Sequence, residues 1–160
     1  MTSQYILIAG AMLILSQISL NVRSSMLQTK DVSYQNEAIL GATAIAQSIL
    51  REAASKKFDE KSIGARITSP DSLTSVGSLG PDFGESYSTF DDVDDYNGYA
   101  TTISTGRLGD YSVAVAVHYT VKDSLGAPSG IRSFMKSIDV TVSGNPYLTT
   151  DLKMNTIVSY

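Results

Sequence analysis

The stretch SQYILIAGAMLILSQISL, residues Ser3–Leu20, is an uncharged apolar segment in a chain whose overall share of apolar residues is ordinary. Every residue from Tyr5 to Leu15 is apolar or glycine, and no charge occurs before Arg23. The segment lacks the basic start and small-residue cleavage site of a secretory signal peptide, and its polar second half makes it a marginal transmembrane anchor. We therefore expect a helix that resides in a bilayer and later packs against identical helices.

A second helical pattern follows over residues 32–54. Its apolar side chains recur every three or four positions, as on one face of an amphipathic helix, and they are Val32, Ile39, Ala42, Ile45, Ala46, Ile49, Leu50 and Ala53. We expect this helix to end near Lys56 or Lys57, where two cations suit the negative end of the helix dipole.

The C-terminal part of the chain alternates between apolar and polar residues. In DYSVAVAVHYTVK, residues 110–122, one face carries Tyr and Val and the other carries Ser, Ala, His and Thr. The runs YATTISTG before it, and SFMKSIDVTVS and YLTTDLKMNTIVSY after it, read as further strands. These patterns predict an α+β fold, in which a long N-terminal α-helix packs on a C-terminal antiparallel β-meander of about four strands.

Between helix and strands, residues 58–98 are rich in Gly, Ser, Asp and Pro, and they predict a long loop without a phosphate-binding motif. One acidic cluster stands out in this loop, formed by Asp91, Asp92, Asp94 and Asp95. The favoured interpretation is a solvated turn, with Asn97 and Gly98 starting the next strand. The alternative is a Ca²⁺ site, because this ion prefers carboxylate oxygens, although the spacing does not fit an EF-hand.

Composition argues against several function classes. The net charge of -4 and the pI near 4.8 provide no basic field for nucleic acid. The chain has no cysteine and one histidine, His118, so thiolate, Cys–His and transition-metal sites are not expected. No G-x-S-x-G motif singles out a serine. We expect no enzyme and no cofactor beyond a possible Ca²⁺, with His118 structural.

The order of apolar helix, amphipathic helix, loop and antiparallel meander resembles the mature form of type IV pilins and pilin-like proteins such as pseudopilins. FDDVDDYNGY, residues 90–99, and SIDVTVSGNPYLTTDLKMNTIVSY, residues 137–160, are similar to stretches in bacterial pilin-like proteins, including minor pilins of the mannose-sensitive haemagglutinin type. The resemblance implies insertion in the inner membrane, removal of a basic leader by a prepilin peptidase and N-methylation of Met1. It also implies assembly by inner-membrane, ATPase-driven machinery into an extracellular filament.

Two positions depart from the family pattern. Members usually carry Glu at mature position five, where this chain has Tyr5, and a Pro near position 22, where it has Asn21 and Val22. The missing Glu favours a minor or initiating subunit. The absence of Lys and Arg before Arg23 favours a cleaved leader, because an uncleaved inner-membrane segment normally has a basic cytoplasmic flank.

The chain is therefore divided into a hydrophobic segment over residues 1–25, an amphipathic helix over 26–57, a variable loop over 58–98 and a sheet head over 99–160. The side chains expected to lie in lipid before assembly and in the filament core afterwards are Tyr5, Ile6, Leu7, Ile8, Gly10, Met12, Leu13, Ile14 and Leu15. The residues expected to unwind in the filament, because they are poor helix formers, include Ser16, Gln17, Ser19, Asn21, Ser24 and Ser25.

Three functions remain open at this point. The first is a structural subunit of a type IV pilus-like filament, whose partners are copies of itself. The second is a minor pilin or type II secretion pseudopilin that primes assembly. The third is a membrane-anchored binding domain that does not polymerise.

Overall fold

The computed structural model describes residues 2–62, 64 and 66–160, and it has the predicted α+β fold. Helix α1 covers Thr2–Ala54, and the strands are β1 (Ala100–Thr105), β2 (Gly109–Tyr119), β3 (Met135–Ser143) and β4 (Leu152–Ser159). Short 3-10 turns lie between helix and sheet, at Glu60–Ser62, Pro70–Ser72, Val76–Ser78 and Asp94–Tyr96. Met1, the predicted processing site, lies outside the described residues.

The chain forms two compact units, Met1–Glu37 and Ala38–Tyr160. The division falls inside the predicted amphipathic helix, not at its predicted start near residue 26. In the first unit, nearly every side chain from Ser3 to Ser33 is exposed. We refer to the second unit, Ala38–Tyr160, as the head.

The segment Ser16–Ser25 is helical in the single chain. The Ser16 hydroxyl donates to the Met12 carbonyl at 2.9 Å, and the Thr29 hydroxyl donates to the Ser25 carbonyl at 2.9 Å. Such bonds give small polar side chains a partner within the helix. The expected unwinding concerns the assembled filament, and it stays a prediction.

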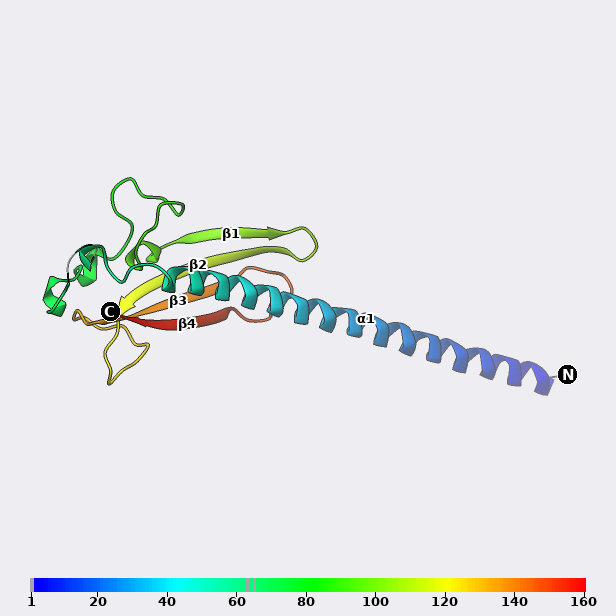
Figure 1. Ribbon diagram of the computed structural model, residues 1–160. Coiled ribbons are helices and arrows are strands. Elements are labelled where there is room, and N and C mark those ends of the chain that lie inside the picture. Colours follow the sequence, from blue (N-terminus) through cyan, green and yellow to red (C-terminus); the bar gives the residue numbers. More distant parts are fainter. Residues whose placement is uncertain (1, 63, 65) are drawn as a thin grey trace. The chain divides into compact units, whose positions relative to one another are not determined.

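In the head, the last turns of α1 lie across one face of the sheet (Figure 1). The buried helix positions are Ala38, Ala42, Ala46, Ile49, Leu50 and Ala53. The predicted stripe is thus confirmed from Ala42 onward. It is wrong for Val32 and Ile39, which are 54% and 45% exposed, and Ile39 is turned about 100° from the buried Ala38. The helix ends at Ala54, slightly before Lys56.

Small residues let the helix approach the sheet closely. A Cβ atom at Gly41 would lie 2.9 Å from the Tyr111 hydroxyl, and this hydroxyl donates to the Ala38 carbonyl at 3.3 Å. Tyr111 is completely buried. The glycine therefore provides space for a tyrosine that joins sheet and helix.

The sheet is a four-stranded antiparallel meander in the order β1-β2-β3-β4, as predicted. On β2, the side chains of Tyr111, Val113, Val115, Val117 and Tyr119 are buried, whereas Ser112, Ala114 and Ala116 are exposed. Val115 faces Val140 of β3 across the central pair. The sheet therefore buries one face under the helix and presents small and polar side chains on the other.

Candidate functional site

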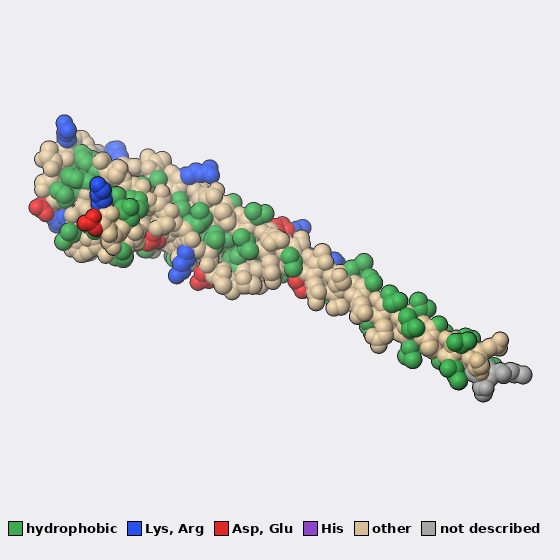
Figure 2. Space-filling model, turned by 90° about the horizontal axis from the view of Figure 1, so that it is seen from below, with side chains coloured by type: hydrophobic (Ala, Val, Ile, Leu, Met, Phe, Trp, Pro, Cys, Tyr) green, Lys and Arg blue, Asp and Glu red, His purple; other side chains and the backbone are tan. Residues whose placement is uncertain are grey.

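The first candidate site is the apolar surface of α1 in the unit Met1–Glu37. The large side chains predicted for the filament core, from Tyr5 to Leu15, are each more than half exposed, and further exposed apolar residues continue to Leu27. Figure 2 shows hydrophobic side chains along this end of the helix. The helix Ser3–Ala54 is long and apolar enough to cross a membrane, and none of its most apolar window is buried. A soluble monomer rarely exposes so much contiguous apolar surface, so this surface is expected to have a partner.

The second candidate site is the acidic loop, which is anchored to the end of the helix and to the sheet. Lys57 N–H donates to the Asp91 carbonyl at 3.2 Å, and Val93 N–H donates to the Lys57 carbonyl at 2.9 Å. At the other end of the loop, the Asn97 side chain accepts from Val117 N–H at 3.0 Å and donates to the Leu79 carbonyl at 2.9 Å. These hydrogen bonds hold both ends of the loop in a defined position within the head.

The favoured interpretation of this loop as a solvated turn is wrong. Asp92, Asp94 and Asp95 are 2%, 3% and 4% exposed. They are buried because the neighbouring side chains of Phe90, Val93 and Tyr96 pack into the hydrophobic core and draw the backbone of the loop inward. The Asp92 carboxylate accepts from the N–H groups of Asp94 at 2.6 Å and Asp95 at 3.2 Å. Burial, together with the charges of Asp94 and Asp95, raises the pKa of Asp92 to about 7.

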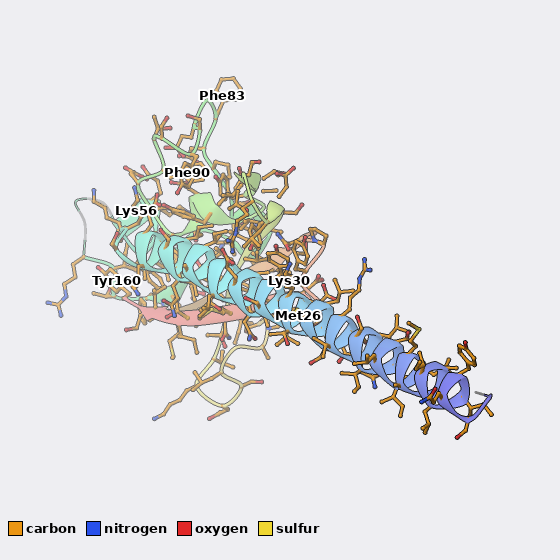
Figure 3. All side chains as sticks on the ribbon, turned by 90° about the vertical axis from the view of Figure 1, so that its right-hand side faces the viewer. Met26, Lys30, Lys56, Phe83, Phe90 and Tyr160 are labelled. Carbon is orange, nitrogen blue, oxygen red and sulfur yellow. The ribbon has the colours of Figure 1, made fainter. Side chains whose placement is uncertain are left out.

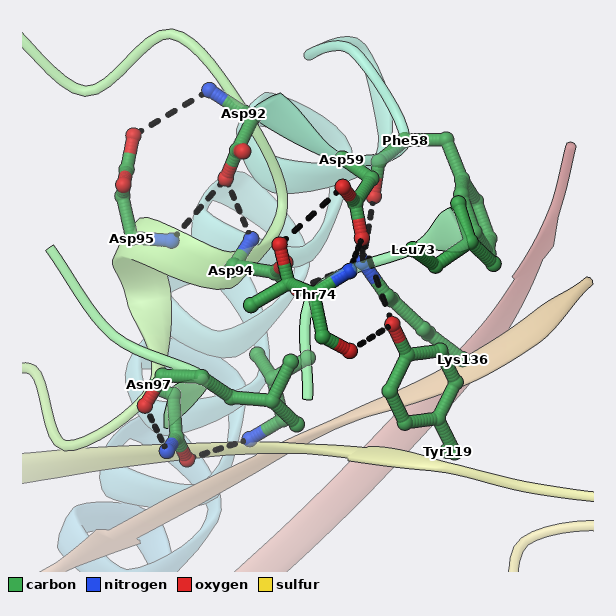
Figure 4. Close-up of polar contacts among 12 residues, drawn as sticks. Phe58, Asp59, Leu73, Thr74, Asp92, Asp94, Asp95, Asn97, Tyr119 and Lys136 are labelled. Atoms are coloured by element: carbon green, nitrogen blue, oxygen red, sulfur yellow. Dashed lines mark hydrogen bonds and ion pairs between the residues drawn. The ribbon is translucent and has the colours of Figure 1, made fainter. Parts of the chain in front are cut away.

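A buried lysine of β3, Lys136, contacts the acidic loop through Asp94 (Figure 4). Lys136 Nζ is completely buried and lies 2.6 Å from Asp94 Oδ1 and 3.0 Å from Asp59 Oδ2. It also donates to the Phe58 carbonyl at 2.7 Å and lies 4.4 Å and 5.1 Å from the ring centres of Phe58 and Tyr119. We call Asp59, Asp94 and Lys136 the buried triad.

The two carboxylates of the triad have different surroundings. Asp59 accepts from Thr74 N–H at 2.9 Å, from the Tyr119 hydroxyl at 3.2 Å and from Lys61 N–H at 3.1 Å. Burial acts to raise the pKa of Asp59, but the Thr74 hydrogen bond and the Lys136 charge bring it below its ordinary value. Asp94 accepts no well-oriented hydrogen bond from any described residue, and burial raises its pKa to about 6 despite Lys136.

The four predicted calcium ligands do not converge on one point. Asp94 pairs with Lys136, and Asp92 is occupied by the N–H groups that follow it. Among the described residues, a group able to hold a cation combines Asp91 and Asp95 with Glu85, whose ligand atoms lie within 4.8 Å of one another. Asp95 Oδ2 already accepts from the N–H groups of Asp91 and Asp92. Calcium binding stays a prediction, now restricted to this smaller group.

An aromatic cluster packs beside the acidic loop. Tyr87 stacks on Tyr99 with ring centres 4.6 Å apart, and Phe90 meets Tyr96 edge to face at 5.2 Å. The hydroxyl groups of Tyr87 and Tyr96 both donate to the Glu52 carboxylate of α1. Figure 3 shows Phe90 close to the helix and Phe83, which is fully exposed, at the tip of its loop. The cluster joins loop and helix through both apolar and polar contacts.

His118 forms contacts within the sheet region. Its Nδ1 lies 3.4 Å from Asp139 Oδ2, and its Nε2 lies 3.3 Å from the Gly126 carbonyl. These partners come from the neighbouring strand and the β2–β3 connection. They are consistent with the structural role expected of this residue.

Sequence reasoning missed Asp59 and Lys136. A signal for Lys136 existed, because this cation occupies an inward position of β3, two residues before the buried Ile138. A charge at such a position calls for a buried counter-charge. Asp59 gave no comparable signal, since it lies in an irregular segment far from its partner in the sequence.

Comparison with known proteins gives no match: no family model, no curated protein and no solved structure aligns with this chain at a significant level.

Proposed function

We propose that this chain is a structural subunit of an extracellular type IV pilus-like filament, which polymerises through α1. The observation that carries the proposal is the exposed apolar surface from Tyr5 to Leu27 on a chain that also forms a well-packed head. Burying one Leu or Ile side chain contributes about 1.5–3 kcal/mol. A row of such residues therefore provides a strong driving force for burial in lipid and then against copies of the same helix.

The composition of the helix favours a packed bundle over a lone membrane span. Gly10 allows close approach of a neighbouring helix, and Ser16 and Gln17 can share hydrogen bonds between helices. The helix also continues well beyond the apolar segment, to Ala54. In this proposal the inner membrane and its assembly machinery hold the subunit before assembly, after a prepilin peptidase has processed it.

The outer face of the sheet suits a filament exterior. Ser112, Ala114 and Ala116 of β2 are exposed beside Thr102 and Ser104 of β1. Small and hydroxylated side chains of this kind tolerate solvent and leave no large apolar patch on that face.

The second candidate is a minor pilin or pseudopilin that primes assembly. The observation that favours it is Tyr5, which occupies the position where the resemblance leads us to expect Glu. A subunit without this carboxylate lacks one contact to the N-terminal amine of a neighbour, and it therefore suits a special position in the filament.

Shearing cells of the source organism and quantifying the released proteins by mass spectrometry tests these candidates. A structural subunit is expected to dominate the sheared fraction, with an N-terminal peptide that is cleaved and methylated. A trace amount would favour the minor subunit. Recovery in the membrane fraction alone would contradict both and support a membrane-anchored domain.

A filament reconstruction tests the expected unwinding. We expect the backbone of Ser16–Ser25 to be partly unwound, with serine and asparagine side chains bonding to the freed backbone groups. Continuous helical hydrogen bonds from Gly10 through Asp31 would contradict this expectation.

A further inference from the structure

We infer that the buried triad is the site of an intramolecular amide bond, formed spontaneously between Lys136 Nζ and the side-chain carboxyl carbon of Asp94. The amine nitrogen lies 2.6 Å from Asp94 Oδ1, with both residues at most 4% exposed (Figure 4). A nucleophile and an electrophile held in contact gain the rate advantage of an intramolecular reaction. The bond would link the acidic loop covalently to β3.

The different surroundings of the two carboxylates assign their roles. Asp59 is held as an anion by the Thr74 and Lys61 N–H groups and by the Tyr119 hydroxyl, so it is a poor electrophile and a suitable proton carrier. Asp94 has one buried oxygen, Oδ2, without a hydrogen-bond or ion-pair partner among the described residues. Its neutral acid form is therefore the easier one to attack.

The reaction requires the neutral forms of both groups, an amine and a carboxylic acid. Phe58 and Tyr119 place their rings around the amine, and Leu73 packs with them. In such a site a buried ion pair is costly, and transfer of one proton from the ammonium group to Asp94 gives an amine facing a carboxylic acid.

The reaction is balanced without any further reactant. The Lys136 nitrogen attacks the Asp94 carboxyl carbon, and the new carbon–nitrogen bond forms while nitrogen gives a proton to Asp59 Oδ2, 3.0 Å away. Asp59 returns this proton to the departing hydroxyl group, the carbon–oxygen bond breaks, and one water molecule leaves. Asp59 is regenerated as a carboxylate, and the net charge of the triad is unchanged.

The bond would give the head a covalent closure that a chain without cysteine cannot obtain from disulfides. Closing a loop restricts the unfolded chain and so favours the folded state. Its value to a subunit under tension rests on the proposed filament, but the bond itself does not depend on it.

The test is the mass of the full-length chain, purified folded in detergent. We expect a mass lower than that of the otherwise unmodified chain by one water molecule. Trypsin should then release a branched product that joins residues 67–107 to residues 133–153 and resists cleavage after Lys136. A cyclic imide at an aspartate also loses water, but it regains water in mild base and leaves the two peptides separate.

Asp94→Ala, which keeps the Lys136–Asp59 pair, should restore the full mass of that variant. Asp91→Ala, at an exposed neighbouring position, should keep the branched product. A folded native chain with its full mass and unlinked peptides would overturn the inference, whether or not it forms filaments. A branch from Lys136 to Asp59 would overturn the assignment of roles. If Asp94→Ala does not fold, the native chain alone decides.

Discussion

Soluble proteins usually bury apolar side chains and expose charged ones, and both the apolar surface of α1 and the buried triad of the head depart from this rule. From Tyr5 to Leu27, large apolar side chains face solvent in the single chain, whereas Asp59, Asp94 and Lys136 are charged residues inside the head. The charged groups of the triad pair with one another within the chain, whereas the large apolar side chains from Tyr5 to Leu27 stay exposed. The difference indicates that the buried charges of the head are paired within one chain, whereas the proposed burial in lipid or against further copies concerns the exposed apolar side chains of the first unit.

The largest expected effect on the head comes from Lys136→Met. This change removes the group that contacts both Asp59 and Asp94, whether Lys136 is an ion-pair partner of Asp94 or its inferred amide partner. Removing one partner of a buried ion pair alone costs about 3–5 kcal/mol. Chemical denaturation of the full chain in detergent, followed by near-ultraviolet circular dichroism, measures it. Lys153→Met, at an exposed position of β4, should change the free energy of unfolding by less than about 0.5 kcal/mol. Equal effects of both variants would contradict a buried role for Lys136.

A smaller effect concerns pH. Because burial in the folded state raises the pKa of Asp92 from its ordinary value of 3.8 to about 7, this group binds its proton more tightly in the folded than in the unfolded chain. The carboxyl is therefore expected to lower the stability of the head as pH rises from about 4 to about 7, with no further change above that range.

Asp92→Asn separates this contribution from those of other groups. The asparagine side chain can still accept from the N–H groups of Asp94 and Asp95 but does not ionise. Thermal melts of the full chain from pH 4 to pH 8 should show a flatter profile for Asp92→Asn than for the native chain. Asp91→Asn, at an exposed position, should keep the native profile. Identical slopes for native chain and Asp92→Asn would show that Asp92 ionises freely.

How much of this comparison could be predicted from the sequence depends on the range of each interaction. The apolar segment and the alternation of β2 are local patterns, and they predicted the helix, the meander and the inward positions Tyr111 to Tyr119. The triad joins Asp59 to Lys136 across 77 positions. No local periodicity encodes such a pair, so local patterns alone favour a solvated acidic run.

The smallest expected effect is at the join between loop and helix. Tyr87→Phe removes a hydroxyl that donates to Glu52 but keeps the ring stacked on Tyr99. Loss of one such bond at a partly exposed site should cost about 0.5–1.5 kcal/mol. Burial and the Glu52 hydrogen bond raise the pKa of Tyr87 to about 12, so ultraviolet titration should show one fewer late-titrating tyrosine in the variant. An unchanged titration would contradict the Tyr87–Glu52 contact.

The most direct test of the central claim uses the absence of cysteine from the chain. Single cysteines are introduced as Leu13→Cys on α1 and Thr102→Cys on the outer face of β1, and filaments sheared from cells are treated with a bulky maleimide before and after denaturation. We predict that position 102 reacts in intact filaments, whereas position 13 reacts only after denaturation. Equal reactivity of both positions in intact, lipid-free filaments would contradict a filament built around α1.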